Sequence, residues 1–252
     1  MRKHLLNNAH KEKHDIPKND EFYTRYVDIS KELGNYTQCL SNKVIYCNCD
    51  SEKSNFVKYF IDNKDKIRYK EFIHSSSDFR SNENIENLKR CDVVITNPPF
   101  SLFREFIQIL VDNQKDFLIV SPLLAFGYKA VVDLFKSGRI KTGYNQLTDF
   151  DNTPKKSRCG WLTTFPIPKT KPVFTQQYDE KKHPKYDNYD AINVDRLIDI
   201  PGDYDGIMGV PITFFWSFDA ANSDYDIIRT LNNTEINGKL KFKRLIIQKK
   251  KL

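Results

Sequence analysis

The sequence predicts an α/β protein with a mostly parallel central sheet, helices on both faces and a loop-rich C-terminal extension. Two observations support this fold class. Between about residues 43 and 138, short apolar runs alternate with segments that repeat apolar residues at helical spacing. Parallel strands need a crossover connection, usually a helix, so this alternation is typical of a parallel sheet. After about residue 139 the chain is rich in Pro, Tyr, Asp and Gly, which favour ordered loops with short strands.

Each element of the first half follows from its hydrophobic pattern. A run of β-branched and aromatic residues predicts a strand, whereas apolar residues three or four positions apart predict the buried face of a helix. In chain order, we expect a strand at 43–48, a helix at 54–63, a strand at 67–73, a turn and short helix within 75–90, a strand at 92–96, a helix at 101–113, a strand at 117–122 and a helix at 124–138. Two of the helices have apolar faces formed by Phe56, Val57, Phe60 and Ile61, and by Leu102, Phe103, Phe106, Ile107 and Leu110.

Composition divides the chain into three parts. We predict a mobile arm at residues 1–19. The alternating strands and helices occupy 20–138, and the remaining sheet edge and the loops occupy 139–252. Loops of this kind commonly carry function. The last segment, KFKRLIIQKKKL (241–252), alternates basic and apolar residues before a basic end. We expect a solvated terminal strand and tail there, with contact to phosphates as the alternative.

Composition and charge also disfavour several classes of protein. The 252 residues, 39% of them apolar, are enough to bury a core, and the sequence has neither a long apolar run nor a signal-peptide core. We therefore expect a globular, cytoplasmic protein that does not span a membrane. The net charge of +7 favours a polyanionic partner.

Cysteine and histidine usage disfavours a disulfide framework and a metal site. The cysteines are odd in number and form no C-x-x-C pair. They are Cys39, Cys47, Cys49, Cys91 and Cys159. The histidines are scattered, and we interpret them as surface residues. They are His4, His10, His14, His74 and His183.

The strand at 92–96 leads directly into Asn97-Pro98-Pro99-Phe100. Neither proline has an N–H group for the ladder, so the strand must end at Asn97. In an open parallel sheet, ligands bind at the carboxyl ends of the strands. The tetrapeptide is therefore expected at a ligand site.

The same four residues suit chemistry at an amino group on a heteroaromatic ring. Such a nitrogen is a poor nucleophile because its lone pair is delocalised. Two acceptors placed against its N–H groups favour a pyramidal nitrogen whose lone pair can attack. The side-chain oxygen of Asn97 and the carbonyl of Pro98 are the predicted acceptors, and the consecutive prolines hold both in place. Phe100 offers a flat face for stacking a base.

These residues lead to a family resemblance. The run TNPPFSLFREF resembles the [DNS]-P-P-[YFW] motif of S-adenosylmethionine-dependent amino-methyltransferases, and in particular that of the EcoRI-type adenine-specific DNA methyltransferases. Four more segments are similar to that family in the expected order, at 19–29, 44–60, 77–81 and 184–215. The resemblance covers nearly the whole chain. It implies a Rossmann-like methyltransferase sheet, with 20–138 as the S-adenosylmethionine-binding catalytic core and the later residues as a DNA-recognition region.

The resemblance also nominates residues for the cofactor after the first strand. Most of the superfamily has a glycine-rich loop there. This chain instead has Asn48-Cys49-Asp50, as in the EcoRI-type variant. These three residues are therefore the implied contacts, with Asp50 as a hydrogen-bond acceptor.

Two other segments match cofactor-contacting positions of related enzymes. Asp78 and Phe79 match the position that binds the adenine of the cofactor, although a plain turn aspartate is the alternative for Asp78. Phe22, Tyr23 and Thr24 match a cofactor-contacting segment that precedes the first strand. For Thr24, a helix N-cap is an additional interpretation.

The function implied by the resemblance is site-specific methylation of adenine N6 in duplex DNA. The target base leaves the stack and enters the slot at the sheet edge, without a metal or a covalent enzyme intermediate. The implied protein is a monomer, with a restriction endonuclease that shares its site without forming a stable complex. The region after 139 is expected to contact DNA, and core packing is the alternative for either tryptophan. The candidate DNA contacts are Arg139, Arg158, Trp161 and Trp216.

Two rival functions stay open. The NPP[YF] motif also serves methyltransferases that act on RNA bases or on glutamine side chains, because all these substrates present a planar nitrogen. The other rival is a catalytically inactive, DNA-binding relative. The intact motif and the segment DEFYT (20–24) count against that second reading.

Overall fold

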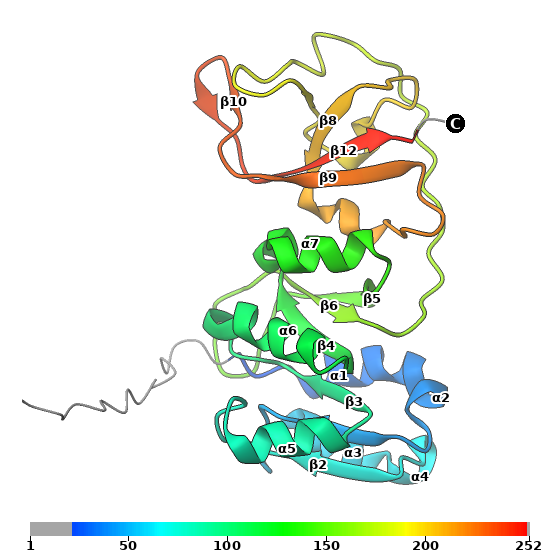
Figure 1. The fold of residues 1–252 in the computed structure, drawn as a ribbon, viewed down its shortest axis with the longest axis vertical. Helices are drawn as coiled ribbons and strands as arrows, with labels where there is room; N and C mark the ends of the chain where they lie inside the picture. The colour runs from blue at the N-terminus through cyan, green and yellow to red at the C-terminus, as the bar shows by residue number, and fades with distance from the viewer. Residues whose placement is uncertain (1–21, 251–252) are drawn as a thin grey trace, which may run out of the picture.

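The computed structural model describes residues 22–250, which form three sheets and the helices that pack on them (Figure 1). A six-stranded sheet lies at one end of the molecule and a four-stranded sheet at the other, with α7 (Lys129–Lys136) between them. The arm expected at 1–19 lies outside the described residues. Among the residues that are described, no helix is both long and apolar enough to cross a bilayer.

The six-stranded sheet has the predicted Rossmann-like arrangement. Its strands are β1 (Val44–Cys47), β2 (Glu71–His74), β3 (Val93–Thr96), β4 (Asp116–Pro122), β5 (Lys141–Leu147) and β6 (Cys159–Thr163), in the order β2-β1-β3-β4-β6-β5. The pairs β1–β2, β1–β3 and β3–β4 are parallel, whereas β6 is antiparallel to both β4 and β5. Because β5 therefore runs parallel to the first four strands, the prediction of a mostly parallel sheet is confirmed.

The strand order creates a point at which the connections diverge. After β1 the chain crosses to β2 on one side and then returns to β3 on the other side of β1. The loops after β1 and β3 therefore leave the same edge in opposite directions. Open α/β sheets bind ligands at such a point, outside the carboxyl ends of the strands.

Helices cover both faces of the sheet, as predicted. One face packs on α1 (Tyr26–Leu33), α2 (Thr37–Leu40), α3 (Asn55–Asp62) and α4 (Lys64–Ile67), and the other on α5 (Asn82–Arg90), α6 (Phe103–Asp112) and α7. Neighbouring strand residues such as Ile45 and Tyr46 belong to opposite clusters, because side chains alternate along a strand. Ser54 and Ser81 cap α3 and α5 through their side-chain oxygens.

Two expectations for the segment 54–73 are wrong. The strand predicted at 67–73 begins only at Glu71, because α4 runs through Ile67 and Arg68 takes the left-handed conformation. On α3, Ile61 is 63% exposed and Tyr59 is buried instead. A residue five positions after Phe56 lies about 140° around the helix from it, whereas one three positions later shares its face.

The C-terminal region contains a second sheet. Its strands are β7 (Ile192–Asn193), β8 (Ile207–Pro211), β12 (Arg244–Lys249) and β9 (Tyr225–Leu231), in that order. β10 (Glu235–Ile236) and β11 (Lys239–Leu240) form a separate hairpin. The 3₁₀ turns of the described chain are η1 (Gly34–Tyr36), η2 (Phe100–Leu102), η3 (Leu123–Gly127), η4 (Leu197–Asp199) and η5 (Ile212–Trp216). The stretch between β6 and β7 is loop, as predicted. The domain boundaries at 20, 138 and 139 stay predictions.

The last strand corrects the expectation of a solvated terminal strand. β12 pairs with β8 on one side and β9 on the other, and Leu245, Ile246 and Ile247 are fully buried. Leu245 and Ile247 pack in the same cluster as α6 and α7. The basic run that begins at Lys249, the last residue of β12, hid this strand, because its charge resembles that of a tail.

Histidine placement differs from the expectation at one position. His183 is buried, its Nε2 lies 2.9 Å from the carbonyl of Asp199, and its Nδ1 accepts a hydrogen bond from the backbone N–H of Asp179. His74 is partly buried in β2. The histidines before residue 22 lie outside the described residues.

Candidate active site

A cavity of about 520 Å³ opens at the carboxyl edge of the six-stranded sheet, between the loops that follow β1 and β3. Its lining comes from five parts of the sequence: 22–24, 49–56, 76–79, 97–99 and Asp151. The lining residues are Phe22, Tyr23, Thr24, Cys49, Asp50, Ser51, Lys53, Ser54, Asn55, Phe56, Ser76, Ser77, Asp78, Phe79, Asn97, Pro98, Pro99 and Asp151. Most of the residues nominated from the sequence therefore meet in one place.

Asn97 presents its amide in one fixed orientation. Its Nδ2 donates to the backbone carbonyl of Phe22 and, at 3.1 Å, to Oγ1 of Thr24. A carbonyl can only accept a hydrogen bond, so the NH₂ group must lie on that side. The opposite atom, Oδ1, is buried and has no hydrogen-bond partner among the described residues. Buried polar atoms are almost always paired, so this oxygen has unused capacity to accept a hydrogen bond.

The two prolines hold the loop that follows Asn97. Pro98 is buried and lines the cavity, and the carbonyl of Pro99 accepts a hydrogen bond from the N–H of Leu102 at 3.1 Å. This bond closes the turn into η2, after which α6 begins at Phe103. The strand therefore ends where the sequence indicated.

Phe100 occupies a different environment from the one expected. It is not among the cavity-lining residues, and its ring stacks on Phe22, with centroids 5.0 Å apart and planes 20° apart. Phe22 also meets Phe150 edge-on at 5.0 Å. One face of the Phe100 ring is thus covered within the protein, and Phe22 brings an aromatic side chain to the cavity wall.

Asp50 is the buried carboxyl group of the site. It accepts hydrogen bonds from Oγ of Ser54 and Oγ1 of Thr96, each at 2.5 Å, and its backbone N–H donates to Ser75. Burial raises its pKa to about 6, and the two hydroxyl donors partly oppose that rise. Thr96 is the residue immediately before Asn97, so Asp50 links the loop after β1 to the end of β3.

The other two residues of the β1 loop differ from each other. Cys49 lines the cavity, and burial raises the pKa of its thiol well above the usual value, so it is a neutral wall residue. Asn48 is buried and is not among the residues that line the cavity, so its assignment as a cofactor contact stays a prediction.

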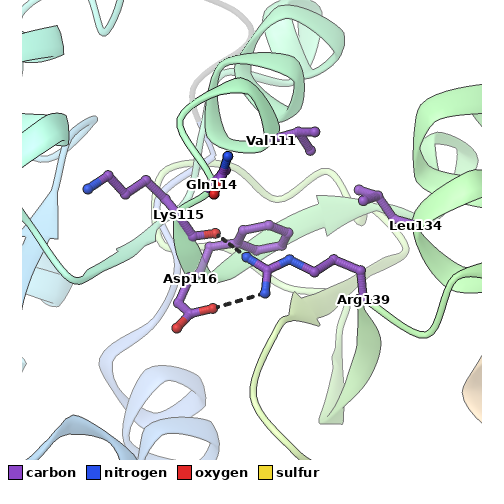
Figure 2. Close-up of a pocket in the computed structure, with 7 residues that line it drawn as sticks. Val111, Gln114, Lys115, Asp116, Leu134 and Arg139 are labelled. Atoms are coloured by element: carbon purple, nitrogen blue, oxygen red, sulfur yellow. Dashed lines mark hydrogen bonds and ion pairs between the residues drawn. The ribbon is translucent and has the colours of Figure 1, made fainter.

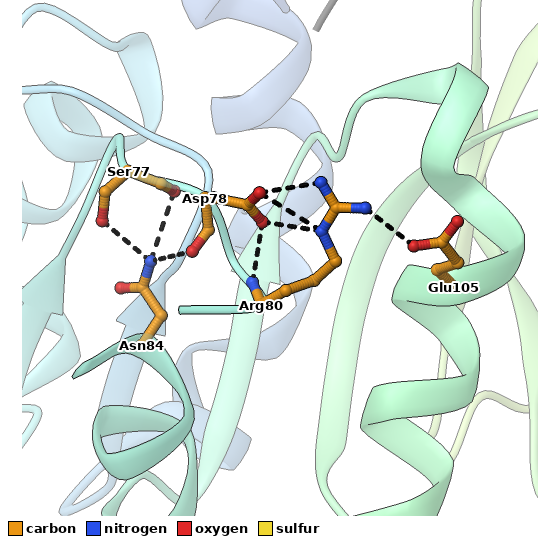
Figure 3. A network of polar contacts seen from close by, with 5 residues as sticks. All are labelled: Ser77, Asp78, Arg80, Asn84 and Glu105. Atoms are coloured by element: carbon orange, nitrogen blue, oxygen red, sulfur yellow. Dashed lines mark hydrogen bonds and ion pairs between the residues drawn. The ribbon is translucent and has the colours of Figure 1, made fainter. Parts of the chain in front are cut away.

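Asp78 is fixed by an ion pair rather than left as a free turn residue (Figure 3). Arg80 donates to both oxygens of its carboxylate, and the Arg80 guanidinium also pairs with Glu105 on α6 at 2.9 Å. Asn84 donates to the backbone carbonyls of Ser77 and Asp78. The loop is therefore held from both sides, with the carboxylate of Asp78 at the cavity.

Phe79, beside Asp78, is buried and packs edge-on against Phe106 with ring centroids 5.1 Å apart. It also lines the cavity, so the apolar contact expected beside the carboxylate of Asp78 is present.

The segment before α1 forms one wall of the cavity because other elements hold it there. The carbonyl of Tyr23 accepts from the N–H of Asp151, and the carbonyl of Thr24 accepts from Nδ2 of Asn55 at 2.9 Å. α1 itself is held by Glu32, whose buried carboxylate accepts from the backbone N–H groups of Tyr144 and Asn145 on β5. Thr24 does not cap α1, which begins at Tyr26 after Arg25.

Several residues of the site were not found from the sequence. Ser54, Thr96 and Arg80 orient Asp50 and Asp78, yet each also fits an ordinary structural pattern: a helix cap, a strand residue and a surface arginine. One signal was present for Ser54, since it follows Asp50 by four positions and precedes a helix. Asp151 and Asn55 lie 96 residues apart, and only the fold brings them together.

The four candidate DNA contacts separate into three groups. Arg158 is exposed, and its carbonyl accepts from the N–H of Leu123 at the end of β4, on the same edge as the cavity. Arg139 lies at the opposite edge, where it pairs with Asp116 and donates to the carbonyl of Lys115 (Figure 2). Arg139 therefore does not belong to the surface around Asn97.

The two tryptophans follow the core-packing alternative. Trp161 is 0% exposed in β6, so the expectation that it contacts DNA is wrong. Trp216 is partly buried and packs edge-on against Phe126, with ring centroids 5.2 Å apart. A Cβ at Gly160 would lie 1.9 Å from the Trp216 ring, so the missing side chain there makes room for the indole.

Comparison with known proteins places these features in context. A family model described as adenine-specific methyltransferase EcoRI matches residues 6–76, 65–153 and 146–251. The chain is 35% identical to the Type II methyltransferase M.EcoRI of Escherichia coli, over 93% of this chain and 94% of that protein. It is 31% identical to M.MgeORF184P of Mycoplasma genitalium, over 93% and 97%, and 31% identical to M.MpnI of Mycoplasma pneumoniae, over 91% and 86%. The matches run through all five parts of the sequence that line the cavity.

Proposed function

Because this chain belongs to the adenine-specific methyltransferase EcoRI family, we propose that it transfers a methyl group from S-adenosylmethionine to N6 of an adenine in duplex DNA. Membership implies a methyltransferase with DNA as its substrate, since the relatives are Type II methyltransferases. The target atom, the release of the base from the stack and the identity of the methyl donor are the content of the proposal.

The observation that carries the proposal is that Asn97 lines the cavity and that its Oδ1 has no hydrogen-bond partner among the described residues. An exocyclic N–H of adenine would give this oxygen its hydrogen bond. The carbonyl of Pro98, one residue on, is the second acceptor. Together they hold the amino group so that its lone pair is available to attack, and neither acceptor has to change its protonation state.

The lining also fits the methyl donor. A volume of about 520 Å³ lies within the usual range for small-molecule sites. The carboxylates of Asp50 and Asp78 are acceptors for its hydroxyl and amino groups, and Phe79 offers an apolar contact. When bound, S-adenosylmethionine supplies a methyl group already activated by its sulfonium. The residues of this chain then need only to bind, orient and exclude water.

The base has to leave the duplex to reach Asn97. N6 of a stacked adenine cannot enter a cavity that is lined by residues from five parts of the chain, whereas an extruded base can. Phe22, which lines the cavity and stacks on Phe100, is the aromatic residue placed to contact it.

The test is transfer of labelled methyl from S-adenosylmethionine to unmethylated duplex DNA, tRNA and total protein, followed by nucleoside mass spectrometry. We expect N6-methyladenine in the DNA and no label with the Asn97→Ala variant. Label in tRNA or protein would overturn the choice of substrate in favour of an RNA-base or glutamine methyltransferase. Absence of both label and S-adenosylmethionine binding would indicate an inactive relative.

A further inference from the structure

We propose that residues 235–243, which comprise the β10–β11 hairpin and the three residues after it, form a surface that binds duplex DNA. This surface extends the carboxyl edge of the six-stranded sheet, here called the catalytic edge, and its apolar contacts are Leu240 and Phe242. This inference rests on the proposed function, because its ligand is the DNA substrate. Arg158 lies on the same sheet edge as the cavity, Arg139 lies at the opposite edge, and the tryptophans pack within the protein, so none of the four belongs to this surface.

The hairpin is a rigid projection. Its turn is Asn237-Gly238, with φ values of +51° and +70°, as a tight two-residue hairpin turn requires. The backbone N–H of Gly238 donates to Asp187 at 2.8 Å, and the N–H of Asp187 donates to the carbonyl of Glu235 at 2.9 Å. Ile236 is buried against Tyr186. The neighbouring segment therefore anchors the hairpin through its inner face.

Leu240, the last residue of the hairpin, and Phe242, two residues beyond it, are apolar side chains that the fold leaves exposed. Phe242 is 87% exposed, the highest value among the large apolar side chains described, and Leu240 is 69% exposed. Single exposed apolar residues are common. Two of them at alternate positions on a rigid projection form a patch, and such patches mark contact sites more often than the rest of a surface does.

Basic residues alternate with these two side chains. The sequence from 237 to 243, NGKLKFK, contains Lys239, Lys241 and Lys243 and no acidic residue. Glu235 is the one acidic residue within 235–243, and of the acidic residues beside the hairpin, Asp195 forms an ion pair with Arg244 at 2.8 Å and Asp187 accepts from the hairpin turn. The strip therefore presents net positive charge to solvent, as a surface for phosphates does.

A shared aromatic ring connects the strip to the catalytic edge. Lys243 Nζ lies 5.7 Å from the ring centroid of Tyr128, and the guanidinium carbon of Arg104 lies 4.3 Å from the same centroid. Lys243 also donates to the carbonyl of Gly127 at 3.3 Å. Arg104 is on the first turn of α6, four residues after Phe100. In Figure 1 the hairpin projects on the side of the molecule where α6 begins.

Two cations around one ring repel each other. The pKa of Lys243 is lowered by burial and by the charge of Arg104. The carboxylate next to Arg104 in sequence, Glu105, pairs with Arg80 instead. A phosphate between Arg104 and Lys243 would supply the missing negative charge, which is the second reason to identify the ligand as a nucleic acid backbone.

The chemistry of the strip favours DNA over a protein partner. The lysines alternate with one aromatic and one aliphatic side chain, and this arrangement suits a ligand that has both phosphates and flat bases. In DNA complexes, apolar side chains of this kind contact sugars and bases or enter between base steps, while lysines bind phosphates. A surface for a protein partner would be centred on the apolar pair and depleted in lysine.

The experiment compares Phe242→Ala and the double variant Lys239→Ala/Lys241→Ala with two controls. Val173→Ala removes a side chain that is 81% exposed on the loop before β7, and Lys66→Ala removes an exposed lysine on α4. Binding to unmethylated linear plasmid DNA is measured by fluorescence anisotropy at several salt concentrations. S-adenosylmethionine binding and thermal unfolding are measured on the same preparations.

We expect Phe242→Ala to raise the Kd for DNA about tenfold, within the range measured for single aromatic contacts to bases. The double lysine variant should weaken binding and lower the slope of log Kd against log salt by about 1 to 2, which corresponds to one or two lost phosphate contacts. Both variants should bind S-adenosylmethionine and unfold as the wild type does. The two controls should leave Kd and the salt slope unchanged.

Unchanged Kd and salt slope in both test variants, with a wild type that binds and methylates DNA, would overturn this inference and leave the proposed function intact. Weakening by the controls as large as that by the test variants would also overturn it, because the effect would then be non-specific. A wild type that neither binds nor methylates DNA would overturn the proposed function, and this inference with it.

Discussion

Two cavities lie at opposite edges of the same sheet, and they differ in what their polar groups have left to bind. At the carboxyl edge, the cavity of about 520 Å³ is lined by Asn97, whose Oδ1 is buried and has no hydrogen-bond partner among the described residues. At the other edge, a cavity of about 390 Å³ is lined by Arg139 and Asp116, which already satisfy each other (Figure 2). Volume alone would rank them as comparable. Unmet hydrogen-bonding capacity in a fixed orientation is what distinguishes a site from a crevice.

The difference follows from topology. At the carboxyl edge, the loops after the neighbouring strands β1 and β3 leave in opposite directions. Polar side chains from several loops therefore converge at this point. At the opposite edge, the lining comes from the end of α6, the start of β4 and the residues around the end of α7. The variants below test this comparison.

The largest effect is expected from Asn97→Ala. Loss of the acceptor should lower kcat for methyl transfer by about 10³-fold, at the upper end of what one preorganised hydrogen-bonding group contributes. The protein should stay folded, because the lost side-chain hydrogen bonds to Phe22 and Thr24 cost only about 1–2 kcal/mol each. Single-turnover rates and circular dichroism check both parts.

Asn97→Asp is the informative companion. It keeps an oxygen toward the cavity but places the other oxygen against the carbonyl of Phe22, where only a donor fits. Activity should fall in this variant as well. A rate within a few-fold of wild type would show that the orientation of the amide does not matter and would remove the main distinction between the two cavities.

Asp50→Asn should change the pH dependence of stability. The folded protein raises the pKa of this carboxyl group from 3.8 to about 6, so the folded state favours the neutral form. The raised pKa stabilises the folded state by up to about 3 kcal/mol below pH 4. This stabilisation is lost as the pH rises to about 6. The Asp50→Asn variant has no carboxyl group at this position, so its free energy of unfolding should not fall in this way between about pH 4 and 6. Denaturant unfolding of both proteins between pH 4 and 7 measures it, and parallel profiles would contradict the prediction.

Thr24→Val should produce a smaller loss at the same site. Valine has nearly the same shape but cannot accept the hydrogen bond from Nδ2 of Asn97, while the carbonyl of Phe22 still can. We expect kcat to fall up to about tenfold with little change in KM for S-adenosylmethionine, since one hydrogen bond is worth about 1 kcal/mol. Thr24→Ser restores the acceptor and should restore most of kcat. An equal loss in both variants would mean that packing, not orientation, is the role of Thr24.

The smallest effects concern the two arginines. Arg158→Ala should raise KM for DNA a few-fold and reduce the salt slope by about 1, because the exposed side chain lies at the cavity edge and is free to bind one phosphate. Arg139→Ala should leave KM, kcat and the salt slope unchanged and cost about 0–1 kcal/mol of stability, since its ion pair is half-exposed. A larger effect of Arg139→Ala on KM for DNA would indicate that DNA binds at the edge opposite Asn97, and would contradict the distinction between the two cavities.

The amino-acid sequence by itself determined the parallel core of the fold, the end of β3 at Asn97 and the family. It could do so because these depend on local properties. Apolar periodicity reports burial, proline cannot join a strand ladder, and a motif is a run of neighbouring residues. The same locality explains where the expectations were wrong. The buried strand β12 resembled a tail because of the lysines after it, and the buried Trp161 carries no local sign that distinguishes it from an exposed one.

Only the tertiary structure decided how the residues of the site meet. Thr24 and Phe22 hold Asn97 from more than 70 residues away, and Thr96 holds Asp50 across 46 positions. No spacing in the sequence encodes such pairs, since strand order and loop direction bring them together. Which edge an arginine occupies, and whether an oxygen is left without a partner, depends on every segment that packs around it. Those two properties separate the candidate active site from the crevice at the opposite edge.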